Sequence, residues 1–195
     1  MKNSNLKRIA IFASGSGTNA ENIVNFFNDN PDVEVNLILS NKKDAYVLQR
    51  AKRLNVKSVV FSREEFYKSS KILNTLHSMK IDLVVLAGFL WLIPENIISS
   101  FRNMIVNIHP ALLPKYGGKG MYGNFVHEAV IKNKEKESGI TIHYVNEIYD
   151  EGQIIFQEKV EVLENDSPDS LAQKIHILEY KYFPKVIEEI LFEKC

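Results

Sequence analysis

Polar side chains of the kinds that perform chemistry are concentrated in three short stretches of the chain, at 14–19, 107–110 and 150–152. In the second stretch, Asn107 and His109 interrupt an otherwise apolar run. An amide and an imidazole are costly to bury unless they have a partner or a task. An amide can donate a hydrogen bond to an oxyanion, and an imidazole can move protons near neutral pH. The pair therefore suits acyl or formyl transfer.

The position of this pair also indicates a site. Side chains alternate along a strand, so Asn107 and His109 are expected to point to the same face. Pro110 ends the strand directly after them, and open α/β sheets bind their ligands at the carboxyl ends of the strands. A third group is needed to set the pKa of His109 or to hold a water molecule, and Asp150 is the best candidate. Spacing alone does not place Asp150 beside His109.

The other histidines are predicted to have structural roles. We interpret His143 and His176 as surface or packing residues, and we expect His77 and His127 on helix surfaces. No two histidines stand at the spacing of metal ligands. The sequence therefore predicts no metal site.

The glycine-rich stretch Ser14-Gly15-Ser16-Gly17-Thr18-Asn19 follows an apolar run and opens a helical pattern. Glycines allow a tight turn and a close approach to a ligand, and amides at a helix N-terminus favour an anion. The glycines also fit a loose dinucleotide fingerprint, but Ser40 and Asn41 stand where that fingerprint needs an acidic residue. The lysine of a Walker loop is missing too. We predict a single phosphate group as the ligand, the alternative being a plain tight turn.

Alternating strand-like and helical segments must position these stretches. Apolar runs of strand character recur at 9–13, 33–39, 58–61, 83–87 and 105–108, with helical patterns at 19–28, 46–54, 64–79 and 94–102. Nearly continuous apolar runs are expected when both faces of a parallel sheet are covered. The alternation predicts right-handed βαβ units and an α/β fold with a doubly wound, mostly parallel sheet.

The second half of the chain predicts a partly antiparallel extension. A helix is expected at 124–133, followed by strands at 139–145 and 153–162 that a turn joins into a hairpin-like pair. A long C-terminal helix should begin at Ser167, with Pro168 at its first helical position. Its apolar residues recur every three or four positions, which indicates core packing: Leu171, Ile175, Leu178, Tyr182, Val186 and Ile190.

Length and composition exclude several classes of protein. The 195 residues include 24 Lys and Arg and 24 Asp and Glu, so the formal net charge is zero. This balance predicts neither a nucleic-acid partner nor a membrane surface. The only cysteine, Cys195, excludes an intrachain disulfide. The longest apolar run, at 83–93, is too short for a membrane helix. We expect one cytoplasmic domain over residues 1–195.

Taken in order, the motifs resemble the phosphoribosylglycinamide formyltransferases, a folate-dependent formyltransferase family of de novo purine (IMP) biosynthesis. The resemblance rests on the glycine-rich loop, the strand at 83–89, Asn-Ile-His-Pro-Ala-Leu-Leu-Pro-Lys-Tyr at 107–116 and Asp150-x-Gly152, and it covers nearly the whole chain. It implies a Rossmann-like formyltransferase fold. It also implies formyl transfer from 10-formyltetrahydrofolate to the amine of glycinamide ribonucleotide, without a metal. A monomer or a homodimer is expected.

The resemblance assigns a catalytic trio, Asn107, His109 and Asp150. Attack of the substrate amine on the formyl carbon gives a tetrahedral oxyanion, which Asn107 and a protonated His109 would stabilise. Asp150 would raise the pKa of His109 and hold an ordered water molecule for proton transfer.

The resemblance also assigns the binding residues. Gly17, Thr18 and Asn19, in the N-terminal half, would hold the ribonucleotide phosphate or its surroundings, and Glu179 would contact the glycinamide end. The folate would lie mainly against the C-terminal half, and the residues implied are Arg63 (facing the acidic tail), Leu90, Trp91, Leu92, Ile93, Asn107, Glu147 and Asp150. Trp91 and the segment 117–120 depart from some relatives, so contacts of that segment are not carried over.

Three alternatives have different discriminating features. A formyltetrahydrofolate hydrolase shares the trio but needs no second substrate and usually carries a regulatory domain. A methionyl-tRNA formyltransferase usually has a further C-terminal domain and a basic surface. A nucleotide-binding module without catalysis would leave the trio unexplained. The glycine-rich loop favours a phosphate-bearing substrate.

Overall fold

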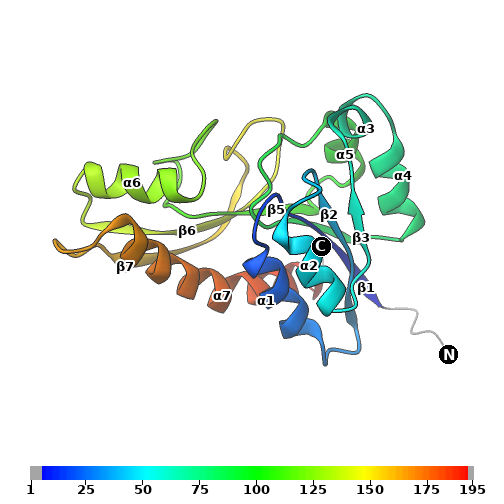
Figure 1. The fold of residues 1–195 in the computed structure, drawn as a ribbon, viewed down its shortest axis with the longest axis horizontal. Coiled ribbons are helices and arrows are strands. Elements are labelled where there is room, and N and C mark those ends of the chain that lie inside the picture. Colours follow the sequence, from blue (N-terminus) through cyan, green and yellow to red (C-terminus); the bar gives the residue numbers. More distant parts are fainter. Residues whose placement is uncertain (1–5, 193–195) are drawn as a thin grey trace.

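A computed structural model describes residues 6–192 and contains one seven-stranded sheet (Figure 1). The strands are β1 (Lys7–Phe12), β2 (Val33–Ser40), β3 (Ser58–Val60), β4 (Leu83–Leu86), β5 (Ile105–His109), β6 (Glu137–Tyr144) and β7 (Ile154–Glu161). The helices are α1 (Thr18–Phe27), α2 (Tyr46–Arg53), α3 (Arg63–Tyr67), α4 (Lys71–Ser78), α5 (Glu95–Ser100), α6 (Asn124–Lys132) and α7 (Pro168–Phe192).

The strand order is β3-β2-β1-β4-β5-β6-β7, and β1 to β5 pair in parallel. β6 and β7 add to this sheet in antiparallel pairs. The chain winds outward from β1 to β3 on one side and from β4 onward on the other. The gap between the carboxyl ends of β1 and β4 is therefore the topological switch point of the sheet, where such folds bind ligands. The predicted doubly wound sheet with an antiparallel extension is confirmed.

Two apolar cores cover the two faces of the sheet. One core joins the sheet to α1, α2, α6 and α7 through residues such as Ile23, Val47 and Ile175. The other joins it to α3, α4 and α5 through residues such as Phe66 and Ile97. β1 and β4 are buried on both faces, because helices cover both sides. This double cover leaves the carboxyl ends of the central strands as the place for a site.

The prediction of one helix over 64–79 is wrong, because the structure has two helices there, α3 and α4. Ser69 lies between them, and its Oγ donates to the carbonyl of Glu65 and accepts from the N–H of Lys71. Serine side chains that bond nearby backbone groups compete with the helical ladder. The Ser69-Ser70 pair is the signal that marks this break.

The long helix α7 begins as predicted. The Oγ of Ser167 accepts from the N–H of Ser170 at 3.1 Å, which caps the helix, and Pro168 is the first helical residue. The predicted apolar stripe contributes to the core on the α1 side of the sheet. Glu179 lies within this packed helix and is buried, so its carboxylate needs polar partners.

Within residues 6–192, none of the helices is long and apolar enough to cross a membrane. Cys195, which the sequence singled out, lies outside the described residues.

Candidate active site

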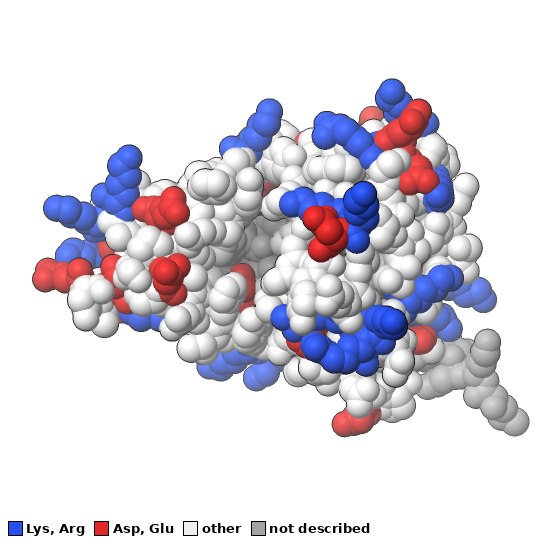
Figure 2. Space-filling view, in the orientation of Figure 1, with Lys and Arg blue, Asp and Glu red and all other residues white. Residues whose placement is uncertain are grey.

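A cavity of about 620 Å³ lies at the switch point, and Figure 2 shows the molecule hollowed near its middle. Its walls come from segments far apart in the sequence. They include residues 14–19 after β1, 87–90 after β4, 107–110 at the end of β5, 118–123, 149–150, Lys42, His127, His176 and Glu179. The glycine-rich loop and the Asn-x-His strand end, predicted separately, are thus parts of one site.

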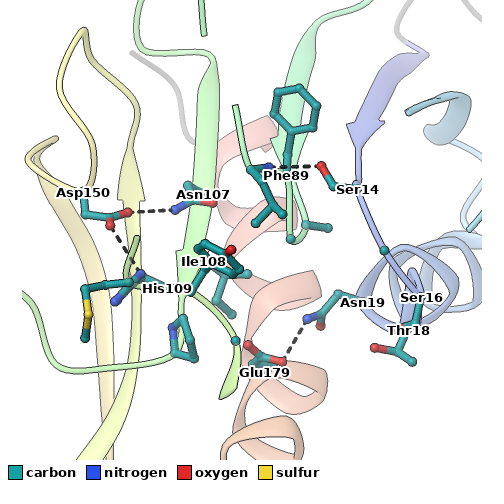
Figure 3. A pocket seen from close by; sticks show the side chains of 18 of the residues that line it. Ser14, Ser16, Thr18, Asn19, Phe89, Asn107, Ile108, His109, Asp150 and Glu179 are labelled. Atoms are coloured by element: carbon teal, nitrogen blue, oxygen red, sulfur yellow. Dashed lines mark hydrogen bonds and ion pairs between the residues drawn. The ribbon is translucent and has the colours of Figure 1, made fainter. Parts of the chain in front are cut away.

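The structure brings the predicted trio together at one end of this cavity (Figure 3). Asn107 and His109 are held by β5, whose ladder pairs Asn107 with Leu86 on one side and His143 on the other. The Nδ1 of His109 lies 3.5 Å from Asp150 Oδ2, and the Nδ2 of Asn107 lies 3.5 Å from Asp150 Oδ1. Asp150 therefore faces both residues with its two oxygens.

Asp150 is positioned by the backbone of its own loop and by a hydrogen bond from the loop that contains Gly118. It has a φ of 58°, a left-handed conformation that aspartate tolerates better than most residues. The N–H of Gly118 donates to Asp150 Oδ2 at 2.9 Å. Burial works against ionisation, but His143, His109 and this N–H outweigh it and lower the pKa of Asp150. The residue is a carboxylate at neutral pH.

His109 is only 3% exposed. Its Nε2 lies 2.7 Å from the carbonyl of Tyr116, so this nitrogen donates and carries the proton of the neutral ring. Burial lowers the pKa of His109, and although Asp150 and the Tyr116 carbonyl work in the opposite direction, the net shift is downward. Asp150 thus acts on the pKa of His109 in the predicted direction, but burial outweighs this charge pair in the protein without ligands.

His143 lies beside the trio and contacts Asn107. Its Nδ1 donates to the carbonyl of Tyr144 at 2.7 Å, so its Nε2 is an acceptor and receives a hydrogen bond from Asn107 Nδ2 at 3.0 Å. Of the two roles predicted for His143, surface or packing, its burial excludes the first. Its hydrogen bond fixes the orientation of the Asn107 amide. The other N–H of that amide has only the long contact to Asp150, which leaves it available to a stronger acceptor.

The glycine-rich loop lies at the opposite end, between β1 and α1. The N–H of Leu90 donates to Ser14 Oγ at 3.1 Å, the N–H of Val47 donates to the carbonyl of Gly15 at 3.1 Å, and Arg50 Nε donates to the carbonyl of Ser16 at 2.9 Å. α2 thus supports the loop from behind. Because the loop opens α1, its residues lie at a helix N-terminus, where anions are bound.

Gly17 is the position in this loop that admits no side chain. Its φ is +76°, and an added Cβ would overlap the Val47 side chain and come within 2.9 Å of the Val47 Cα. Gly17→Ala should lower the free energy of unfolding by about 2 kcal/mol. Gly15→Ala is the matched control, because nothing lies within 4 Å of its added Cβ. It should change stability by less than about 0.5 kcal/mol. Denaturant unfolding measures both, and equal losses would contradict this account of the loop.

Glu179 ties the loop helix α1 to α7. Its Oε2 accepts from Asn19 Nδ2 at 2.9 Å and lies 2.9 Å from His176 Nδ1 (Figure 3). The hydrogen bond between Glu179 and His176 is the main cause of the raised pKa of His176. Asn19 Oδ1 is buried and has no partner among the described residues. The predicted ribonucleotide residues Gly17, Thr18, Asn19 and Glu179 all line the cavity.

The predicted folate residues are not all brought to the cavity wall. Leu90 lines it together with Asn107 and Asp150. Ile93 is buried in the core on the α3 side, and Glu147 is exposed in the loop before Asp150.

An aromatic cluster outside the cavity wall holds the rest of the predicted folate residues. Arg63 lies over Tyr67 and Trp91, at 5.1 and 5.6 Å from their ring centroids, and the carbonyl of Leu92 accepts from Tyr67 Oη. Contacts of these residues with folate stay a prediction.

The residues of the cavity wall that sequence reasoning did not assign to the site include Lys42, His127 and His176. The prediction that His127 lies on a helix surface is wrong, because α6 packs this face against α7 and leaves His127 only 3% exposed. Lys42 follows the carboxyl end of β2, and His176 precedes Glu179 by one helical turn. The position of Lys42 after a strand end, and that of His176 on the same helix face as Glu179, could have indicated that both belong to the site.

Three histidines of the site should titrate in a defined order. Burial lowers the pKa of His109 and His127 below 6.5, and Glu179 raises that of His176 above it. As pH falls below 6.5, His109 and His127 bind protons more readily in the unfolded chain than in the folded protein. These two residues therefore destabilise the fold as pH falls. The stabilisation from His176 is complete below 6.5 and is lost as pH rises through its folded pKa. Titration of the ring protons by NMR checks the order, and His109 titrating above His176 would refute it.

Among residues 6–192, no cluster of three or more His, Cys, Asp or Glu side chains is arranged to hold a metal ion.

The sequence and the fold are those of a known family. The family described as formyl transferase matches residues 7–187, so the chain belongs to the formyl transferase family.

Several relatives within that family are named phosphoribosylglycinamide formyltransferase. The chain is 39% identical to the chloroplastic phosphoribosylglycinamide formyltransferase of Arabidopsis thaliana over 96% of this chain, and it spans just under two thirds (66%) of that protein. It is 35% identical to the phosphoribosylglycinamide formyltransferase of Bacillus subtilis, over 95% of both chains. The crystal structure of phosphoribosylglycinamide formyltransferase from Bacillus halodurans is similar, with a TM-score of 0.85, 36% identity and 96% of both chains covered.

Proposed function

We propose that the protein transfers a formyl group from 10-formyltetrahydrofolate to the amine of glycinamide ribonucleotide, a step of de novo purine biosynthesis. The observation that carries the proposal is the layout of the cavity. An anion-binding loop occupies one end, and an amide, an imidazole and a carboxylate occupy the other. The names of the relatives support the same activity.

The ribonucleotide fits the end formed by α1 and α7. The N–H groups of Gly17, Thr18 and Asn19 at the start of α1 would bind its phosphate. Glu179, held by Asn19 and His176, would receive hydrogen bonds from the glycinamide end. The amine would then lie toward Asn107 and His109.

The folate fits the remaining walls. Apolar and aromatic side chains there come from Phe89, Leu90, Ile108, Tyr122 and Tyr149, the kind of lining that takes a flat ring system. 10-Formyltetrahydrofolate supplies the activated formyl group. Other predicted folate residues lie outside the cavity wall and would contact the parts of the cosubstrate that extend beyond it. These residues are Arg63, Trp91, Leu92, Ile93 and Glu147.

In the reaction, a C–N bond forms between the substrate amine and the formyl carbon, and the carbonyl oxygen becomes an oxyanion. Asn107 would donate its second N–H to that oxygen. Protonation of His109 would place a new N–H on Nδ1, beside Asp150 and Asn107, where it would donate to the same oxygen. The amine nitrogen loses a proton and the folate nitrogen gains one as the old C–N bond breaks. Asp150 would hold the water molecule that carries this proton.

The low pKa of His109 has a role in this proposal. The buried ring is neutral in the free protein because burial outweighs Asp150. An oxyanion forming beside it adds a negative charge and favours the protonated ring. The ring then carries its positive charge in the transition state and not in the ground state. The site therefore binds the transition state more strongly than the substrates.

The proposal includes one formyltransferase domain over residues 1–195, small-molecule partners, a cytoplasmic location, and a monomer or homodimer. Size-exclusion chromatography with light scattering distinguishes the two assembly states.

The test is the dependence of folate turnover on the ribonucleotide. Absorbance follows the conversion of 10-formyltetrahydrofolate to tetrahydrofolate, and the rate should saturate with glycinamide ribonucleotide and fall to background without it. Turnover that ignores the ribonucleotide would favour a hydrolase instead.

A further inference from the structure

His127 lines the cavity but has no role in the reaction described above. It lies near the start of α6, is only 3% exposed, and its Nδ1 has no hydrogen-bond partner among the described residues. Native structures pair nearly all buried polar groups, so an unpaired nitrogen needs an explanation. The ring lines the cavity, so a ligand group toward which the ring turns would provide the missing partner.

The surroundings of His127 indicate which part of a ligand this is. Its electrostatic neighbours are His176 and Glu179 and, more weakly, His109. His176 and Glu179 mark the ribonucleotide end, and His109 marks the reacting end. His127 therefore lies toward the glycinamide end of the ribonucleotide, which carries the reacting amine and which Glu179 and His109 both face in the proposed reaction.

The charge state of His127 limits the kinds of ligand group that it can bind. Burial and the neighbouring His176 lower its pKa, so the ring is neutral at pH 7. A neutral imidazole has one donor and one acceptor nitrogen, which suits an uncharged hydroxyl or amide better than a phosphate.

We propose that His127 is a further substrate-binding residue that hydrogen-bonds an uncharged sugar hydroxyl or amide group of the ribonucleotide. The inference rests on the proposed function, because it takes the ribonucleotide as the ligand. A purely structural role explains the observations less well. Val126 and Val130 fill the core from the same helix as apolar residues, and an apolar residue at 127 would leave no unpaired nitrogen.

The experiment compares His127→Leu, His127→Asn and the control His77→Leu, a change of an exposed histidine on α4. Calorimetric titration with glycinamide ribonucleotide should give a Kd for His127→Leu that is on the order of tenfold weaker than wild type. His127→Asn keeps a polar group and should recover part of the loss. His77→Leu should bind like wild type.

Two further readouts separate ligand binding from packing. Without ligand, His127→Leu should have a Tm equal to or above wild type, since a buried unpaired group is removed. Inorganic phosphate should compete with the ribonucleotide equally well in both proteins, because the proposed partner of His127 is an uncharged group and not the phosphate.

Each contrary outcome has its own meaning. An unchanged Kd in His127→Leu, or a weaker Kd accompanied by a lower Tm, would overturn the role of His127. Weaker competition by phosphate in His127→Leu would overturn the assignment of an uncharged group as its partner. A wild-type protein that does not bind the ribonucleotide would instead contradict the proposed function itself.

Discussion

His109→Asn is expected to lower kcat by about two to four orders of magnitude while the protein still folds and binds the ribonucleotide. The substitution removes both a donor to the oxyanion and the imidazole that takes up a proton, and each such loss costs at least about 10²-fold. The asparagine side chain is too short to reach the carbonyl of Tyr116, which His109 Nε2 bonds in the structure. The free protein should therefore lose this one hydrogen bond, which is a modest cost in stability.

Steady-state kinetics with both substrates measures this effect, and calorimetric binding of the ribonucleotide shows whether the site is intact. His77→Asn is the matched control, because His77 is exposed on α4 and its ring contacts Ser100 and Phe101. Its kcat should equal that of wild type. A His109→Asn protein with near-normal kcat would remove His109 from the mechanism.

Asp150→Asn should lower kcat by about 10²- to 10³-fold and should also change the pH profile. Among the influences that raise the pKa of His109, the charge of Asp150 is the largest. Without it, the pKa of His109 falls further, and a smaller fraction of the ring is protonated at neutral pH. The remaining activity should therefore increase toward lower pH, with its midpoint shifted to lower pH than in wild type.

The control is Asp166→Asn. Asp166 is hydrogen-bonded to Lys174, Ser170 and the N–H of Leu163, and these contacts lower its pKa to about 2. Because none of them lies in the cavity wall, this change should reduce stability at neutral pH and leave kcat and its pH profile unchanged. An Asp150→Asn protein that loses rate with an unshifted pH profile would indicate a purely structural role for Asp150.

The parallel half of the fold and one face of the site were predictable from local patterns. Buried strands alternate with amphipathic helices, which defines a doubly wound sheet. The spacing of Asn107 and His109 placed both side chains at one strand end, and both line the cavity. These features depend on the period of a strand and on sheet topology, which short stretches of sequence encode.

Features that depend on distant packing were not predictable from the residues themselves. Asp150 reaches His109 because β6 pairs with β5 and the following loop returns to the cavity. His127 is buried because α6 packs on α7. The pKa of His109 falls because burial outweighs its charged neighbour, and burial is a property of the complete fold.

The fate of a labelled formyl carbon tests the central claim most directly. The protein is mixed with glycinamide ribonucleotide and 10-formyltetrahydrofolate carrying ¹³C in the formyl group, and ¹³C NMR follows the label. Transfer by the site described here predicts that the label appears in the formamide of the formylated ribonucleotide, in a one-to-one ratio with the tetrahydrofolate released. Label that accumulates as free formate, with the ribonucleotide unchanged, would contradict it.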